Sequence, residues 1–196
     1  VRYEALVQLL EEIQTLDDIA GISQQVVVRW KYFANVASWR LVLVDDGGFL
    51  VIDGVGGEAR IAEVPVLSGW DEHHWRAQRP CLIRRNDVQH ALPPPEHLGG
   101  HDMTEIEVLP FIRSTRCIAL LSVAAGNKPF NALDDKFIRL FGGQLVDRIF
   151  GIVRRRQATR RLSESEARYR GLAENSADWV WARDLKGRLT YSNECG

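Results

Sequence analysis

Cysteine is scarce in this sequence, which has only Cys81, Cys117 and Cys195. An odd number of widely spaced cysteines excludes a disulfide framework and a zinc knuckle, and it is typical of a reducing cytoplasm. Long hydrophobic runs are also missing, because no stretch approaches about 18 uncharged apolar residues. We therefore expect this segment to be cytoplasmic and to make no membrane contact.

Neither sign of charge dominates, since 25 lysines and arginines face 26 aspartates and glutamates, for a formal net charge of −1. This balance gives no electrostatic reason for nucleic-acid binding by the whole chain. The one strongly basic stretch is the arginine run at 154–161, and Glu164 and Glu166 follow it closely. We interpret the run as the solvated face of a linking helix.

What the sequence does contain is the composition of an ordinary globular protein. The hydrophobic fraction is 45% and the charged fraction is 26%, which excludes a disordered chain. At 196 residues the chain accommodates one domain of about 150 residues with a further segment attached. A domain of that size buries a substantial core.

Hydrophobic periodicity predicts the order of the secondary-structure elements. Apolar residues at helical spacing indicate amphipathic helices, and Thr15 is the expected N-cap of the second one. Expected helices cover residues 1–15, 17–34, 70–78 and a long stretch from 131, and expected strands cover 39–45, 49–55, 60–66, 80–83, 105–112 and 116–125. Pro65 places 60–66 at a sheet edge. The pattern predicts an α+β fold with a mostly antiparallel sheet flanked by helices.

The long closing helix carries an apolar stripe. Asn131 is its predicted cap, and Leu145, Ile149 and Ile152 recur at steps of three and four residues. Such a stripe is suited to a parallel two-helix seam with a second copy of the chain. We therefore predict a homodimer formed through this C-terminal helix.

Beyond residue 153 the apolar stripe thins, and the chain changes character. Ser163 and Glu166 have capping-box spacing, so a second helical segment is expected to begin at Ser163. Two short strands, 179–182 and 189–193, follow with a turn at 184–188 between them. One hairpin and one helix cannot close a core, so we expect the opening of an unfinished domain. The predicted divisions are 1–153, a basic helical linker at 154–165, and 166–196.

Several stretches between about residues 17 and 150 carry a family resemblance. They are 39–45 with its hairpin, Arg79-Pro80-Cys81-Leu82-Ile83, Glu107-Val108-Leu109-Pro110-Phe111, 118–124, and Phe130 with Asp134-Asp135. This part of the chain resembles a GAF domain, the small α+β sensor module of bacterial kinases, cyclic-dinucleotide enzymes and mammalian phosphodiesterases. The resemblance implies a GAF-like antiparallel sheet with a long C-terminal signalling helix.

Asn127, Lys128, Phe130, Asp134 and Asp135 are similar to the Asn-Lys-Phe-Asp-Glu signature of cyclic-nucleotide GAF domains, with Asp135 where that signature has glutamate. The resemblance implies that these residues stabilise the turn beside the pocket more than they touch a ligand. An ion pair of Lys128 with Asp134 or Asp135 is the expected means.

Residues 166–193 resemble the start of a PAS domain. The entry helix is matched by 168–175, and the first hairpin is matched by 178–181 and 184–193. The order GAF, helix, PAS is similar to that of bacterial sensor histidine kinases and diguanylate cyclases. The segment contains no catalytic motif of either enzyme, so the output domain of such a protein would lie elsewhere.

A small-molecule pocket between the sheet and the crossover is the sharpest functional hypothesis. Aromatic side chains with a few convergent polar groups suit such a site. The candidate lining residues are Trp70, His73, His74, Trp75, Arg85, Asp87 and His101. The alternative is that the two tryptophans form the apolar face of a short helix and the two histidines its exposed face. The sequence does not identify a cofactor.

Metal, thiol and chromophore chemistry are poorly supported. The five histidines, at 73, 74, 90, 97 and 101, have no close cysteine partner, so no metal site is predicted. Cys81 and Cys117 fall inside predicted strands, where a buried thiol behaves as a small apolar group. Neither lies in a bilin-attachment pattern.

These observations predict a non-catalytic sensory input segment of a bacterial signal-transduction protein, such as a two-component system. A small ligand or a neighbouring domain would change helix packing, and a dimeric exit helix would relay the change. The alternative is a ligand-free dimerisation module, and a thiol enzyme or chromophore-binding protein is the third class. A longer protein would carry the histidine kinase or cyclic-dinucleotide output.

Overall fold

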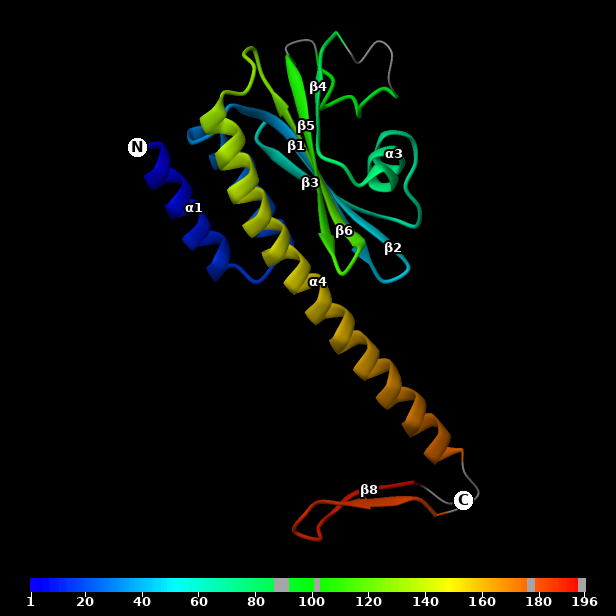
Figure 1. Ribbon diagram of the computed structural model, residues 1–196. Helices are drawn as coiled ribbons and strands as arrows, with labels where there is room; N and C mark the ends of the chain where they lie inside the picture. Colours follow the sequence, from blue (N-terminus) through cyan, green and yellow to red (C-terminus); the bar gives the residue numbers. More distant parts are fainter. Residues whose placement is uncertain (87–91, 101–102, 176–178, 194–196) are drawn as a thin grey trace. The chain divides into compact units, whose positions relative to one another are not determined.

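The computed structural model describes residues 1–86, 92–100, 103–175 and 179–193 (Figure 1). The helical elements are α1 (Arg2–Thr15), α2 (Ile19–Arg29), a short 3-10 helix η1 (Trp30–Tyr32), α3 (Gly69–Ala77) and α4 (Ala132–Glu174). The strands are β1 (Val36–Asp45), β2 (Gly48–Val55), β3 (Glu58–Val64), β4 (Cys81–Arg84), β5 (Glu105–Arg113), β6 (Arg116–Ala125), β7 (Trp181–Arg183) and β8 (Leu189–Ser192). The predicted α+β order is confirmed.

Six strands form one antiparallel sheet in the order β3-β2-β1-β6-β5-β4. The hairpins β1–β2 and β5–β6 pair through β1 and β6 at the centre, and α3 lies in the crossover that leads to the β4 edge. β3 is an edge strand as predicted, and it ends at Val64, one residue before Pro65. Proline lacks the N–H that another ladder hydrogen bond would need.

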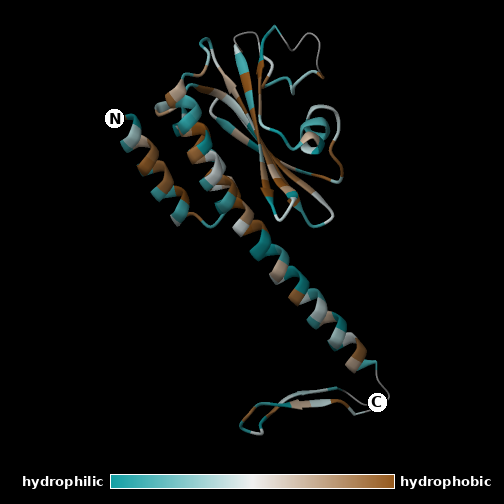
Figure 2. Ribbon diagram, in the orientation of Figure 1, coloured by the Kyte–Doolittle hydropathy of each residue, from teal (hydrophilic) through white to brown (hydrophobic). Residues whose placement is uncertain are grey.

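Alternate residues of the central strands point to opposite faces of the sheet. Trp39, Leu41 and Leu43 pack with α1, α2 and the first part of α4, in a large core. Val42 and Leu120 point the other way and pack with α3 and the segment around Leu98, in a smaller core. Figures 1 and 2 show α1 and α4 on one side of the sheet and α3 on the other. We call these the α4 face and the α3 face.

The caps explain where two helices begin. Asp18, and not the predicted Thr15, caps α2: its Oδ1 accepts a hydrogen bond of 2.7 Å from Gly21 N. Thr15 ends α1 instead, and its hydroxyl donates to the Glu12 carbonyl at 2.8 Å. Asn131 caps α4 as predicted, since its Oδ1 accepts from Leu133 N and Asp134 N at 2.9 and 3.0 Å. A cap of this kind stabilises a helix by about 1 kcal/mol.

Gly142 sets how closely α4 approaches the sheet. A Cβ atom at this position would lie 2.7 Å from Leu121 Cδ2 of β6, whereas one at Gly143 would lie 4.0 Å from its nearest neighbour, Phe111 Cε1. Glycine lowers helix propensity, and here it is the residue that admits the β6 side chain. What approaches α4 at Gly142 is therefore a side chain of its own sheet.

The chain divides into two compact units, Val1–Val153 and Arg154–Gly196. In the second unit β7 and β8 form a hairpin, and Asn193 Nδ2 donates to the Ala173 carbonyl at 2.8 Å. α4 continues through Ser163, so the prediction of a new segment there was wrong. No glycine or proline interrupts 152–170, and Arg160 pairs with Glu164 one turn later. Among the described residues, no helix is long and apolar enough to cross a membrane.

Candidate functional site

The helix α3 carries four of the residues predicted to line a ligand pocket, and they do not share one environment. Trp70 and His74 are buried, with ring centroids 4.4 Å apart, and Trp75 packs edge-on against Phe49. His73 and Arg85 are exposed. Asp87 and His101 lie outside the described residues. The tryptophans and His73 fit the alternative, in which these residues form the apolar and exposed faces of a short helix, whereas His74 is buried. Ligand binding on the α3 face stays a prediction.

An ion-pair network occupies the middle of the α3 face. Arg40 of β1 donates to both oxygens of Asp53 at 2.7 and 2.8 Å, and to both oxygens of Asp71 at 2.9 to 3.1 Å. His97 Nε2 lies 3.2 Å from Asp53 Oδ1. The side chain of Asp71 is only 9% exposed. The guanidinium thus joins β1, β2 and α3 at the place where the sequence predicted space for a ligand.

Burial and charge act against each other in this network. Burial alone would raise the pKa of Asp53, but the adjacent His97 ring and the Arg40 charge lower it below its usual value. Burial would likewise lower the pKa of Arg40, and its bonds to Asp71 and Asp53 raise it instead. Burial, followed by the charge of His73, lowers the pKa of His74 to about 4, so His74 is neutral at physiological pH. The Arg40 guanidinium is therefore a fixed charge that is neutralised by two carboxylates on the α3 face.

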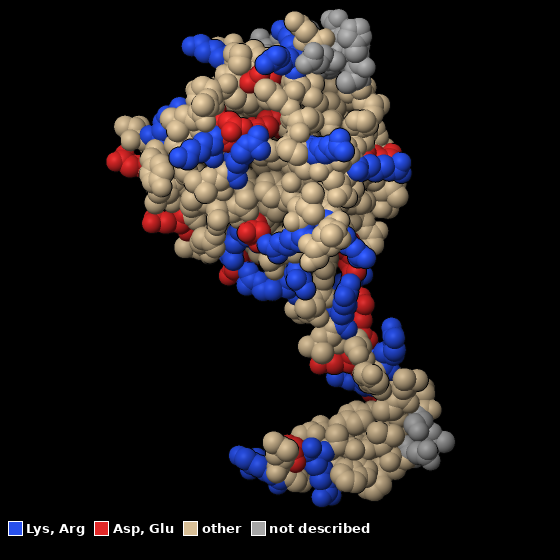
Figure 3. Space-filling model, in the orientation of Figure 1, with Lys and Arg blue, Asp and Glu red and all other residues tan. Residues whose placement is uncertain are grey.

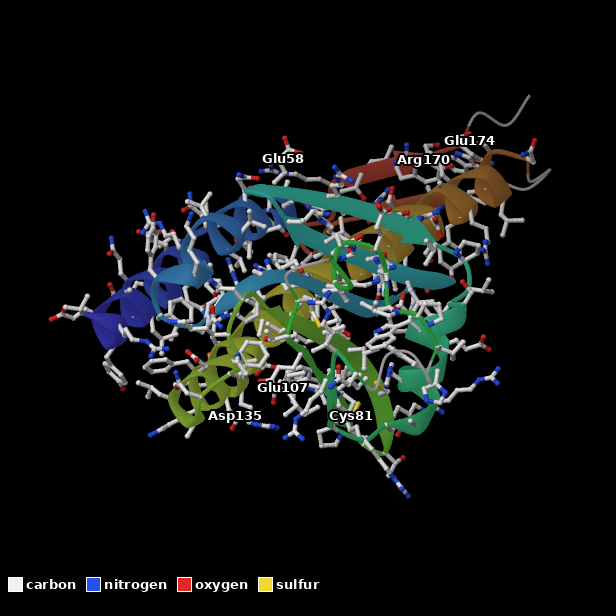
Figure 4. The ribbon with its side chains drawn as sticks, turned by 90° about the horizontal axis from the view of Figure 1, so that it is seen from above. Glu58, Cys81, Glu107, Asp135, Arg170 and Glu174 are labelled. Atoms are coloured by element: carbon white, nitrogen blue, oxygen red, sulfur yellow. The ribbon has the colours of Figure 1, made fainter. Side chains whose placement is uncertain are left out.

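A pocket of about 430 Å³ lies at the β4 edge of the sheet, beside the start of α4. We call it the Glu107 pocket. Its lining is Pro80, Cys81, Leu82, Glu105, Glu107, Phe130, Asn131, Ala132, Asp135 and Arg139. Figure 4 labels Glu107 between Asp135 of α4 and Cys81 of β4. The residues that begin the longest helix of the described chain thus line this pocket.

Glu107 is the most perturbed acid of the pocket. It is 3% exposed, and Arg139 Nη2 lies 2.5 Å from its Oε1. This contact is an ion pair without hydrogen-bond alignment, because neither Glu107 oxygen has a hydrogen-bond partner in the described structure. Burial raises the pKa of Glu107 to about 7, the nearby Asp135 carboxyl group adds to the shift, and the Arg139 charge opposes it. Glu107 therefore changes charge near neutral pH.

Sequence reasoning missed Arg40, Glu105, Glu107 and Arg139, although the signal was present. Arg40 is a charged residue within a strand predicted to be covered on both faces, and such a residue needs a charged partner. Glu105 and Glu107 are two residues apart in an otherwise apolar strand, so both point to one face. Acidic side chains on a covered face of a sheet indicate either a basic partner or a binding site.

The predicted signature residues form the turn into α4, with different partners from those expected. Asp134 is buried, pairs with Arg2 of α1, and accepts from Asn35 N at 3.2 Å. Asp135 pairs with Arg139 at 2.8 Å, and Lys128 is exposed with its carbonyl accepting from Asn35 Nδ2. Arg2 and Arg139 thus hold the two carboxylates for which Lys128 was the expected partner. Phe130 packs against the large core, and Asn127 is exposed in the turn.

The predicted dimer residues lie inside their own domain. Leu145, Ile149 and Ile152 are at most 3% exposed and pack in the core of the α4 face. A seam through these three side chains would require them to leave that core. Dimerisation itself stays a prediction, and it needs other residues.

Both described cysteines have raised pKa values. Burial raises the pKa of Cys117 to about 11 despite backbone contacts that oppose it, and burial raises the pKa of Cys81. Cys81 Sγ lies 3.7 Å from His74 Nδ1, and this neutral ring does not stabilise a thiolate. Within the described part of the chain, no group of three or more His, Cys, Asp or Glu residues is arranged to hold a metal ion.

No protein-family model and no curated protein sequence matches this chain. Solved structures do match it, and they define the first unit as a GAF-like fold. The GAF domain of a phosphoenolpyruvate-protein phosphotransferase from Coxiella burnetii has a TM-score of 0.59 at 17% identity, covering 80% of this chain and 96% of that one. The GAF domain of a two-component sensor histidine kinase from Bacillus halodurans has a TM-score of 0.53 at 13% identity, covering 74% and 99%.

An enzyme has the same fold. A free methionine-R-sulfoxide reductase from Neisseria meningitidis matches with a TM-score of 0.54 at 16% identity, covering 79% of this chain and 90% of that one. The GAF-like fold therefore occurs both in domains of signalling proteins and in an enzyme, and the choice between them rests on the residues of this chain.

Proposed function

We propose that this chain is a non-catalytic sensory input segment of a cytoplasmic signal-transduction protein. The GAF-like fold supports this assignment, and so does the course of α4. This helix runs for 43 residues without a break, beginning at the Glu107 pocket and continuing from the first compact unit into the second.

The proposed mechanism is a shift between two packings of α4 on the sheet. Occupation of the Glu107 pocket, or a contact with a neighbouring domain, would stabilise one packing through Asp135 and Arg139 in the first turns of the helix. Because a helix is stiff along its axis, the change would reach the residues beyond Val153. Only a difference in affinity between the two packings drives such a shift.

The thiols support a non-catalytic role. A catalytic cysteine needs a lowered pKa and access to substrate, whereas Cys117 is buried and both described cysteines have raised pKa values. We expect Cys81 and Cys117 to react slowly with a disulfide reagent in the folded chain, and quickly in urea. Fast reaction of either thiol in the folded chain would favour the enzyme class.

We propose that the chain dimerises through an exposed stripe on the second half of α4. Leu162, Tyr169 and Leu172 are 61%, 70% and 66% exposed, and their spacing of seven and three residues is that of coiled-coil core positions. Sedimentation at high micromolar concentration is expected to show a dimer that the double variant Leu162→Glu, Leu172→Glu abolishes. Leu185→Glu, in the exposed turn of the hairpin, is the matched control. A monomeric wild-type chain would overturn the dimeric relay.

We further propose that 166–193 corresponds to the beginning of a PAS domain in a longer protein with a histidine kinase or cyclic-dinucleotide output. The β7–β8 hairpin and its Asp184 turn support this proposal, since Asp184 Oδ1 accepts from Lys186 N and Arg188 N at 2.8 and 2.9 Å. Residues encoded after Gly196, where present, are expected to supply the remaining PAS strands. A stop codon at that point, or an unrelated sequence, would contradict the proposal.

A further inference from the structure

The Glu107 pocket lies on the opposite side of the sheet from the Arg40 network. Leu82 pairs with Glu107 in the β4–β5 ladder, and Leu109 of the same strand belongs to the core under α4, so this lining belongs to the α4 face. The pocket is located where α4 leaves the β4 edge of the sheet uncovered. It is therefore distinct from the site that the sequence predicted on the α3 face.

The charges around the pocket do not balance. Glu105 Oε1 accepts from Phe130 N at 2.5 Å, and Asp135 pairs with Arg139 Nε at 2.8 Å. Arg139 also supplies the ion pair to Glu107, so one guanidinium serves two of three carboxyl groups. Figure 3 shows acidic side chains gathered beside the start of α4 with basic ones at their border. An additional cation would find a favourable potential here, and an anion would be repelled.

Glu107 supplies the specific contact. Glu107 is 3% exposed and lines the pocket, and apart from the ion pair of its Oε1 with Arg139, its oxygens have no hydrogen-bond partner among the described residues. Buried carboxylate oxygens without donors carry a desolvation penalty that a ligand with N–H donors would remove. An ammonium group has three such donors, and a guanidinium group has five.

The remaining lining limits what else the ligand contains. Pro80, Leu82 and Phe130 present apolar surface, and Leu82 is 49% exposed. A volume of about 430 Å³ is within the range of small-molecule sites, at the smaller end. Glu105, Glu107 and Asp135 all line the pocket, but no three such side chains among the described residues are arranged to hold a metal ion, so the lining favours an organic cation. A short aliphatic body next to the charged group would cover Leu82 and Phe130.

We propose that the Glu107 pocket binds a small organic cation, a primary ammonium or guanidinium group on a short apolar body, with Glu107 as its anionic partner. This inference deepens the proposed function, because it assigns a ligand class to the pocket from which α4 begins. The bound cation replaces Arg139 as the partner of Glu107, and Arg139 keeps its ion pair with Asp135. Glu107 shares its site with a proton near neutral pH, so cation binding releases a proton.

The test is calorimetric titration of the full chain with n-butylamine, with n-butanol and butyrate as probes of the same length and different charge. We expect n-butylamine to bind, the other two to fail, and the measured heat near pH 7 to vary with the ionisation enthalpy of the buffer. Equal binding of all three, or no binding of n-butylamine, would overturn the proposal.

Three variants locate the site. Glu107→Gln keeps the shape and removes the charge, so n-butylamine should bind at least about tenfold more weakly. Arg139→Gln removes the competing guanidinium and should tighten binding. Glu58→Gln, an exposed acid on the distant β3 edge, is the matched control and should leave binding unchanged (Figure 4). If Glu107→Gln binds n-butylamine as tightly as the wild-type chain does, the amine binds elsewhere and the proposal is wrong. If the chain is monomeric and still binds n-butylamine, the dimeric relay is wrong and the proposed class of ligand stands.

Discussion

Replacing Arg40 by methionine tests whether the ion-pair network holds the α3 face together. Methionine preserves much of the buried stem and removes the guanidinium that bonds to Asp53 and Asp71. Two carboxylates, 22% and 9% exposed, would lose their main cation. Breaking a buried pair in this way costs about 3–5 kcal/mol, and we expect about 3 because Asp53 keeps contact with water and His97.

The expected assay is urea unfolding followed by circular dichroism at several pH values. In the wild-type chain the lowered pKa of Asp53 contributes stability that is present at neutral pH and lost as the pH falls through the folded-state pKa. In Arg40→Met the buried carboxylates lack their cation, so protonation at lower pH removes uncompensated charge and reduces the destabilisation of the variant. The difference in unfolding free energy between the two chains should therefore narrow toward acid pH.

Two further chains make the Arg40 result decisive. Arg76→Met removes an exposed pair with Glu72, one turn away on α3, and should cost less than about 1 kcal/mol. Adding Asp71→Asn to Arg40→Met removes one stranded charge and should recover part of the loss. If Arg40→Met costs no more than Arg76→Met, or if its deficit is the same at acid and neutral pH, the network does not stabilise the α3 face as described.

Two other substitutions probe α4 and its pocket. Glu107 has a folded-state pKa of about 7 against an ordinary value of 4.5, so the unfolding free energy of the wild-type chain should fall as the pH rises from about 4.5 to about 7. In urea titrations Glu107→Gln should lack this fall, and its unfolding free energy above pH 7 should exceed that of the wild-type chain by about 2–3 kcal/mol. A parallel pH dependence in both chains would contradict the raised pKa. Gly142→Ala should cost about 1–3 kcal/mol in thermal or urea unfolding because its Cβ meets Leu121, whereas Gly143→Ala should be neutral or stabilising by up to about 1 kcal/mol. Equal effects at the two glycines would refute the close approach.

Sequence periodicity located most elements because strands and helices differ in their local patterns. The strand 116–125 was predicted with the bounds that β6 has, since turn residues flank a mostly apolar run. Caps were harder to choose, because Thr15 and Asp18 are both good capping residues, and only the geometry at Gly21 selects Asp18. Ser163 shows the same limit, since a capping box inside a continuous helix has the same sequence as one at a helix start.

The site was less predictable than the fold because its residues meet only in three dimensions. An apolar stripe such as Leu145, Ile149 and Ile152 shows that something covers the helix, but not whether the cover is its own sheet or a second copy. Glu107 and Arg139 lie 32 positions apart in the sequence, and their pairing depends on how α4 crosses β5. Long-range charge pairs of this kind leave no periodic signal in a single sequence.

The most direct test of the relay is amide hydrogen exchange along α4 in the wild-type chain and in Arg139→Gln, which removes the ion pairs to Glu107 and Asp135. Lys136→Gln, an exposed change in the same helical turns, serves as the control. We expect the change in amide protection caused by Arg139→Gln to begin at the pocket and to continue past Val153 into the second half of α4, with no such change in the control. A change confined to the first turns of α4 would contradict it.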